Sequence, residues 1–139
     1  MEVHCQKGVG PIRFGMAREE VLNLFSVEAT SLKRNQADTH PCDYFASLGC
    51  FIYYGDESGL VEAIELTNPA KPTLDGIDLM HLGFIDLLKI IRDVDSEVSI
   101  DDDGFTSFLL GIGGWAPGLK SAPSAQLESI IVFAPGYYD

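Results

Sequence analysis

Carboxylates crowded between residues 93 and 103 are the residues whose type and spacing are best suited to chemistry. Six acids fall in eleven positions with no basic residue among them: Asp93, Asp95, Glu97, Asp101, Asp102 and Asp103. Such a run holds a divalent cation, faces a basic partner, or forms a solvated loop. An EF-hand calcium loop is excluded. With Gly104 in sixth place its last residue is Leu110, where the ion needs a bidentate glutamate.

The cysteines and histidines form no recognisable site. The chain has three of each, and their spacing does not match the close Cys–Cys or His–His pairs that bind zinc. No G-x-S-x-G nucleophile motif is present, and no Cys–His pair stands in a recognisable catalytic context. We therefore assign no catalytic residue, no metal ligand and no cofactor, and we expect a protein that is not an enzyme.

Aromatic residues are the second group suited to recognition. Alternation places Phe51 and Tyr53 on one face of an expected strand and Tyr54 on the other, while Trp115 follows two glycines and Tyr137 lies near the last residue. Exposed Tyr and Trp are good anchors for a protein partner. Core packing is the competing interpretation, and it is the stronger one for Phe51 and Trp115. The candidate partner-binding residues are the six acids with Tyr53, Trp115 and Tyr137.

The glycine-rich stretch KGVGPIRFGMAREEVLNLF, residues 7–25, has some features of a phosphate-binding loop. Pro11 removes a backbone donor where one is needed, and no Gly-Lys-Ser/Thr follows. The stretch is better explained as a short extended segment that turns into a helix near Ala17. Ala17 is a poor N-cap, but Glu20 stands where a capping-box acid would lie.

Three segments of the chain recur in the same order, which indicates two related halves. Residues 10–25 resemble 75–91, residues 43–54 resemble 103–115 at an offset of 60, and residues 61–66 resemble 127–132 at an offset of 66. Each set reads as an extended segment and helix, followed by strands. The competing explanation is similar patterning of two α+β segments without common origin.

We expect an α+β protein in which a unit of one helix and an antiparallel β-meander is duplicated in tandem, with the helices packed on one face of an antiparallel sheet. The whole chain, 1–139, would be a single domain of two repeats, about 8–67 and 75–134. The proline-containing segment 68–76 would join them.

The Ile-x-x-Gly-Met pattern before the first helix, with Gly15 and Met16 followed by Val21, resembles the β-lactamase-inhibitor-protein-like fold, which includes the SmpA/OmlA outer-membrane lipoproteins. That resemblance implies two helix-plus-meander units sharing one sheet. The chain departs from it in having Ala17 where Thr or Ser is usual and in lacking a lipobox cysteine. It also resembles small bacterial proteins, mostly of unassigned activity and of immunity type, that end in F-x-P-G-Y-Y-D.

Charge narrows the classes of partner. The chain has 21 acidic and 9 basic residues, a formal net charge of −12 and a pI near 4.4. Such a surface repels nucleic acid and anionic lipid and attracts basic proteins. The sequence shows no signal peptide or long apolar span, and its odd number of cysteines favours reduced thiols, so we expect a cytoplasmic protein without membrane or nucleic-acid partners.

These features favour a protein-binding inhibitor, specifically an immunity protein that neutralises a cognate basic bacterial toxin such as a nuclease. The alternative is a domain that binds a small molecule or a divalent metal ion in a pocket between helices and sheet.

Overall fold

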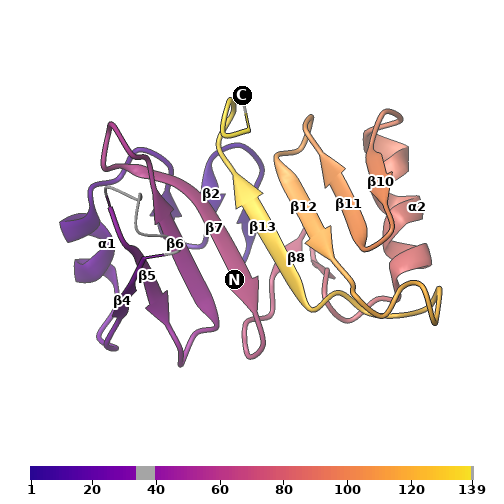
Figure 1. Cartoon of the computed structure of the whole chain (residues 1–139), viewed down its shortest axis with the longest axis horizontal. Helices are drawn as coiled ribbons and strands as arrows, with labels where there is room; N and C mark the ends of the chain where they lie inside the picture. The colour runs from indigo at the N-terminus through magenta and orange to yellow at the C-terminus, as the bar shows by residue number, and fades with distance from the viewer. Residues whose placement is uncertain (34–39, 139) are drawn as a thin grey trace.

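One eight-stranded antiparallel sheet runs through the computed structural model, which describes residues 1–33 and 40–138 (Figure 1). The strands lie in the order β10-β11-β12-β13-β7-β6-β5-β4, so β7 and β13 pair at the centre. Their bounds are β4 Thr30–Leu32, β5 Cys42–Phe45, β6 Cys50–Tyr54, β7 Val61–Thr67, β10 Ser99–Asp101, β11 Gly104–Ser107, β12 Ile112–Trp115 and β13 Ser129–Phe133. The two meanders β4–β7 and β10–β13 therefore meet along one antiparallel pair.

Two helices and two small sheets lie behind the large sheet in the view of Figure 1. The helices are α1, Arg18–Leu24, and α2, Phe84–Val94. The small sheets contain β1 Val3–His4, β2 Gly8–Val9 and β3 Ile12–Arg13, and β8 Thr73–Leu74 and β9 Ile77–Asp78. Helix α2 is amphipathic because its buried residues recur at helical spacing, namely Phe84, Leu87, Leu88 and Ile91. None of the helices formed by the described residues is long and apolar enough to cross a membrane.

Alternation along each strand separates a covered face from an open one. Ile52, Ile64 and Leu66 are fully buried and belong to the cluster that packs against both helices. Phe51 lies on the opposite, open face, and Tyr53 belongs with Ala63 to a small second cluster there. The predicted division of Phe51 and Tyr53 from Tyr54 is confirmed, as is the α+β class with helices and a large antiparallel sheet.

The glycine-rich stretch forms the hairpin β2–β3 and then α1. Val9 and Ile12 are fully buried, and Gly8 cannot be replaced easily, because a Cβ there would lie 2.0 Å from the Ile12 carbonyl oxygen. Ala17 is the N-cap of α1, and its N–H donates to Oε1 of Glu20 at 3.1 Å. The segment thus starts a helix through packing and capping, as the sequence indicated.

The acidic run is divided between elements and does not form the single loop that one interpretation of the sequence assumed. Asp93 lies in the last turn of α2, and Asp95 is the C-cap of that helix. Asp101 ends β10, and Asp102 and Asp103 form the turn into β11. The acids of the helix end and those of the two-residue turn therefore belong to different elements and do not form one cluster.

A buried ion pair anchors α1 to the sheet. Arg18 donates from Nε to Oδ2 of Asp43 at 2.9 Å and from Nη2 to Oδ1 at 2.9 Å, and the Tyr54 hydroxyl donates to Oδ2 at 2.7 Å. The Asp43 side chain is 0% exposed, whereas that of Arg18 is 47% exposed. Three donor groups on two side chains thus satisfy a carboxylate that has no access to water.

The corresponding positions of the other meander are apolar. The hairpin β5–β6 closes with the pair Phe45–Cys50, and the hairpin β11–β12 closes with the pair Ser107–Ile112. Counting back along the strands from these closing pairs matches each residue of the first hairpin with one of the second. Asp43 then corresponds to Phe105, whose ring lies 6.2 Å from that of Phe84, the first residue of α2. Since an aromatic pair suffices to dock α2, the fold itself does not require an ion pair at this junction.

Substitutions in the ion pair are predicted to be unequal in their effect on stability. Arg18→Met leaves a fully buried carboxylate without its counter-charge and should lower the free energy of unfolding by about 3–5 kcal/mol. Asp43→Leu leaves Arg18 half exposed to water and the buried Tyr54 hydroxyl without its acceptor, and should lower it by about 1–3 kcal/mol. Urea unfolding followed by circular dichroism measures both values, and a larger loss for Asp43→Leu would contradict the assignment.

Stability is also predicted to fall in alkaline solution. Burial, followed by the hydrogen bond to Asp43, raises the pKa of Tyr54 above its ordinary 10.0, and burial raises the pKa of Cys50 from 9.0 to about 12. The folded chain therefore holds both protons more tightly than the unfolded chain does. Their contribution is complete below pH 9 and is lost as the pH rises through the folded-state values. Urea unfolding at a series of alkaline pH values should show a shallower decline for the variant Tyr54→Phe/Cys50→Ala, and equal declines would refute the explanation.

Candidate functional site

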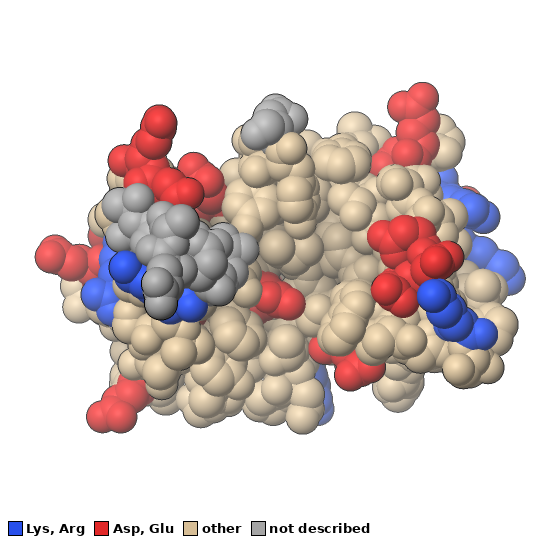
Figure 2. Space-filling view, viewed as in Figure 1, with Lys and Arg blue, Asp and Glu red and all other residues tan. Residues whose placement is uncertain are grey.

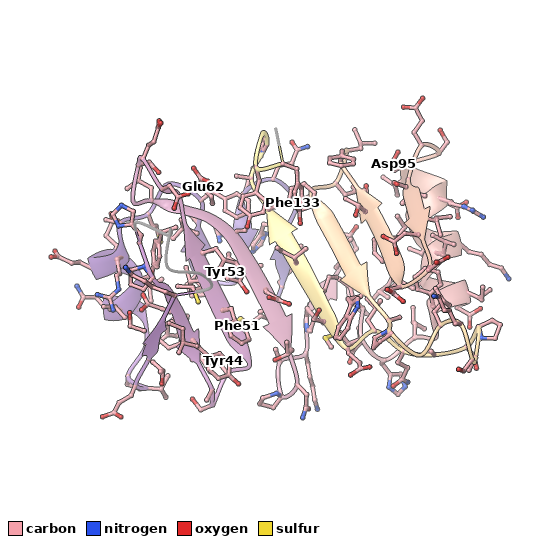
Figure 3. The ribbon with its side chains drawn as sticks, in the orientation of Figure 1. Tyr44, Phe51, Tyr53, Glu62, Asp95 and Phe133 are labelled. Carbon is pink, nitrogen blue, oxygen red and sulfur yellow. The ribbon has the colours of Figure 1, made fainter. Side chains whose placement is uncertain are left out.

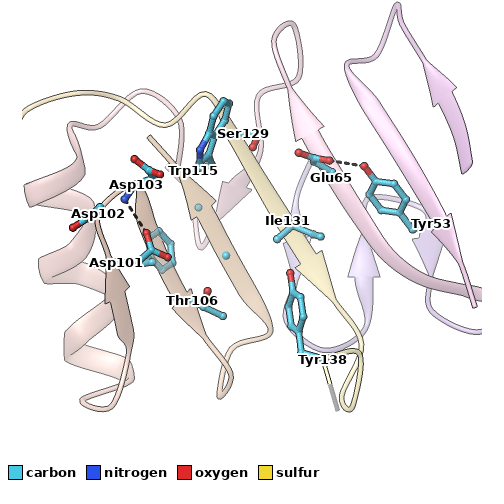
Figure 4. Close-up of a pocket in the computed structure, with 13 residues that line it drawn as sticks. Tyr53, Glu65, Asp101, Asp102, Asp103, Thr106, Trp115, Ser129, Ile131 and Tyr138 are labelled. Carbon is cyan, nitrogen blue, oxygen red and sulfur yellow. Dashed lines mark hydrogen bonds between the residues drawn. The ribbon is translucent and has the colours of Figure 1, made fainter. Parts of the chain in front are cut away.

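A hollow of about 620 Å³ lies on the open face of the sheet, over the second meander and the central strands (Figure 4). Strands β6, β7 and β10–β13 and the chain end at Tyr138 contribute to its lining. Acidic and aromatic side chains surround it, namely Tyr53, Glu65, Asp101, Asp102, Asp103, Trp115 and Tyr138. Neither helix contributes to this lining, so the hollow belongs to the face that the helices leave uncovered.

The floor of the hollow is low because small residues occupy its central positions. Thr106 pairs with Gly113, which pairs with Ile131, so these three residues form one row across β11, β12 and β13. The row continues through Glu65 on β7 to Phe51 on β6. A strand interior with glycine marks a place where another group approaches the backbone closely.

The first meander fills the same row with aromatic rings. When the hairpins are matched from their closing pairs, Thr106 and Gly113 correspond to Tyr44 and Phe51. The Tyr44 and Phe51 rings stack with centroids 4.1 Å apart, and Tyr53 lies 6.4 Å beyond Phe51 (Figure 3). The hollow therefore exists because the second meander lacks the two rings that cover the first.

Two aromatic side chains and a glutamate form the walls. Trp115 is 50% exposed, so the prediction that it fills the core is wrong: it stands at the end of β12 on the open face. Tyr138 is also exposed and lines the hollow from the chain end. On the opposite side, the Tyr53 hydroxyl donates to Oε1 of Glu65 at 2.5 Å, which orients that carboxylate (Figure 4).

The β10–β11 turn supplies a rim of negative charge. Oδ1 of Asp101 accepts the N–H of Asp103 at 2.8 Å, so the turn is held by its own side chain. Lys120 lies 3.6 Å from Asp102, but both side chains are largely exposed and such a pair is weak. Among the described residues that line the hollow, four are carboxylates and none is Lys or Arg. Figure 2 shows acidic side chains gathered on this side of the sheet, with basic ones beside them. A group that enters the hollow is therefore favoured if it is cationic.

The structure brings together five of the nine residues singled out in the sequence. Their side chains line the hollow: Asp101, Asp102, Asp103, Tyr53 and Trp115. Asp95 instead is buried, with Oδ2 accepting from the Ser107 hydroxyl at 2.8 Å and Oδ1 from the N–H of Glu97 at 3.0 Å. Its contacts are those of a residue that ties the end of α2 to β11.

The other three predicted residues lie apart from the hollow. Asp93 and Glu97 are exposed, in and just after α2, and do not line it. Tyr137 packs its ring 6.2 Å from that of Phe133 and lines a smaller hollow of about 210 Å³ with Phe108 and Tyr138.

Residues that the sequence interpretation missed complete the site. Glu65 was not singled out, although alternation in VEAIELT places it opposite the buried Ile64 and Leu66. That alternation was the available signal. Thr106 and Gly113 could not be found this way, because they matter for the bulky rings that they lack, compared with Tyr44 and Phe51 at the matched positions of the first meander.

The described part of the chain offers no metal-binding cluster. No cluster of three or more His, Cys, Asp and Glu side chains with a geometry fit for a metal ion was found among residues 1–33 and 40–138. The acids of the β10–β11 turn are therefore neighbours along the chain without a converging set of ligand atoms.

Proteins of known family or structure give no guide to the function of this chain. The chain matches no family model, no curated protein and no solved structure.

Proposed function

We propose that this protein binds a basic protein with the open face of its sheet and inhibits it, as an immunity protein neutralises a cognate bacterial toxin such as a nuclease. The observation that carries the proposal is the hollow, where four carboxylates adjoin exposed aromatic rings and none of the described lining residues is Lys or Arg. A nuclease active site is basic because it binds phosphate, so it is complementary to such a surface.

The distribution of charge supports this kind of partner. The formal net charge of −12 speeds the approach of a basic protein and disfavours nucleic acid. Trp115 and Tyr138 add exposed aromatic area next to the carboxylates, and Trp and Tyr are the residue types that contribute most to binding energy in protein interfaces. Reduced thiols and the acidic surface suit the cytoplasm, where an immunity protein would meet its toxin.

The order of elements also supports the proposal. A short hairpin, a helix and a four-stranded meander follow one another in each half, and the halves meet at β7 and β13. We infer from this order a tandem duplication over about 8–67 and 75–134, within one domain. It is the arrangement that the resemblance to the β-lactamase-inhibitor-protein-like fold implies, in which two helix-plus-meander units share one sheet.

Protection against the toxin is the direct test. A toxin domain encoded beside the gene for this protein should arrest growth when expressed alone, and co-expression of the wild-type chain should restore growth. The variant Asp101→Asn/Asp102→Asn/Asp103→Asn should protect poorly, because its association rate at low salt should fall by about ten-fold or more. Surface plasmon resonance with the purified domains measures that rate.

The matched control removes equal charge elsewhere. Asp86→Asn/Asp93→Asn/Glu97→Gln changes three exposed carboxylates on or just after α2, away from the hollow. It should protect as well as the wild type. Equal loss in both triple variants would mean that only net charge matters, and an unprotected toxin with the wild-type chain would end the proposal.

The alternative of a metal-binding domain predicts a different result. If the carboxylates of the β10–β11 turn bound Ca²⁺, Mg²⁺ or Zn²⁺, millimolar metal would raise the melting temperature by several degrees. We expect no such rise, because the described residues do not provide a converging set of ligands. Differential scanning fluorimetry checks this. A rise that disappears in Asp101→Asn/Asp103→Asn would favour the metal-binding alternative over the inhibitor.

A further inference from the structure

The geometry points to one anchor for the partner: we propose that an arginine side chain of the basic protein enters the hollow between Trp115 and the β10–β11 turn. This inference rests on the proposed function, since it names the chemistry of the partner's group that the hollow receives. It predicts a guanidinium stacked on the Trp115 ring and paired with the carboxylates of Asp101 and Asp103.

A bare strand segment separates the two sides of this slot. Asp101 pairs with Gly104 and Gly104 pairs with Trp115, so the acid and the ring flank a position that has no side chain. Neighbouring strands lie about 4.8 Å apart, which places the Asp101 and Trp115 backbones about 10 Å from each other. Asp101 and Trp115 both line the hollow, so a group that enters it meets the acid on one side and the ring on the other.

The slot is an obligatory feature of this backbone. A Cβ at Gly104 would lie 1.9 Å from the carbonyl oxygen of Gly114, so no other residue fits there without moving the strand. The matched position in the first meander is Cys42, and Tyr44 is the next residue on the same face, so that meander has side chains where the second has a gap. The second meander alone therefore offers this entry.

Arginine suits the slot better than lysine does. Its guanidinium is planar and weakly hydrated, stacks on an indole ring, and donates to carboxylates in a fixed fork. Asp101 is held in place because its Oδ1 already accepts the N–H of Asp103. Glu65, oriented by the Tyr53 hydroxyl, adds negative charge on the far side of the hollow for neighbouring basic residues. Lysine would gain the charge attraction without the stacking.

Trp115 is also the reporter, because it is the only tryptophan in the chain. The probes are three capped peptides, acetyl-Gly-X-Gly-amide, in which X is arginine, lysine or citrulline, the uncharged analogue of arginine. Titration of the wild-type protein with the arginine peptide should change Trp115 fluorescence saturably. The lysine peptide should bind about three-fold more weakly or worse, and the citrulline peptide should give no saturable change.

Two variants locate the effect. Asp101→Asn/Asp103→Asn retains the turn, because an amide oxygen still accepts a backbone N–H. This variant should bind the arginine peptide with an affinity about ten-fold lower than that of the wild type. Thr106→Tyr fills the hollow with a ring like that of Tyr44, and it should abolish the change in Trp115 fluorescence on addition of the arginine peptide. The matched control Asp93→Asn/Glu97→Gln removes the same charge outside the hollow and should bind the peptide like the wild type.

The outcomes separate this inference from the proposed function. Equal binding of arginine and citrulline, equal binding of arginine and lysine, or full binding by Asp101→Asn/Asp103→Asn would overturn the arginine site. Protection by the wild-type chain against the neighbouring toxin, combined with any of these results, would leave the inhibitor function standing without the site. The expected peptide results without protection would uphold the site and refute the toxin as its partner.

Discussion

The antiparallel pairing of β7 with β13 is the constraint on which the rest of the structure depends. Five residue pairs, from Thr67–Ser129 to Ala63–Phe133, fix the register between the two meanders. Because side chains alternate along a strand, this register decides which residues of both meanders share the open face. A shift by one position would place Glu65 in the core and Leu66 in water. The row from Thr106 to Phe51, and with it the hollow, therefore follows from the central pair.

The two meanders distribute polarity in opposite ways. In the first, a fully buried carboxylate and a half-exposed arginine join the helix to the sheet, while stacked rings cover the open face. In the second, the Phe84 and Phe105 rings join the helix to the sheet, while the open face has a glycine and a rim of acids. Both arrangements join a helix to the same core cluster. The difference between them, and not the common framework, makes one region suited to recognition.

Much of the fold could be predicted from local pattern, and less of the site. Buried residues at helical spacing in α2 and alternation in β7 are local signals, and both elements formed where they were expected. The alignment of 43–54 with 103–115 at an offset of 60 matched Asp43 with Asp103 by residue type. Hairpin closure instead matches Asp43 with Phe105, because the turns and not the residue types set the register. Likewise, Asp95 was grouped with its acidic neighbours, although Ser107, twelve residues away, determines its role.

The low floor of the hollow has a thermodynamic consequence. It is made of strand backbone that is hydrogen-bonded on both sides, between β11 and β13, and it owes its depth to missing side chains and not to the conformation of a loop. The cavity is therefore present before any ligand arrives. Binding there orders little of the protein, so the conformational entropy that usually opposes association is small on this side of the interface. The backbone floor would have little freedom to give up on association, and most of the ordering would fall on exposed side chains and on the partner.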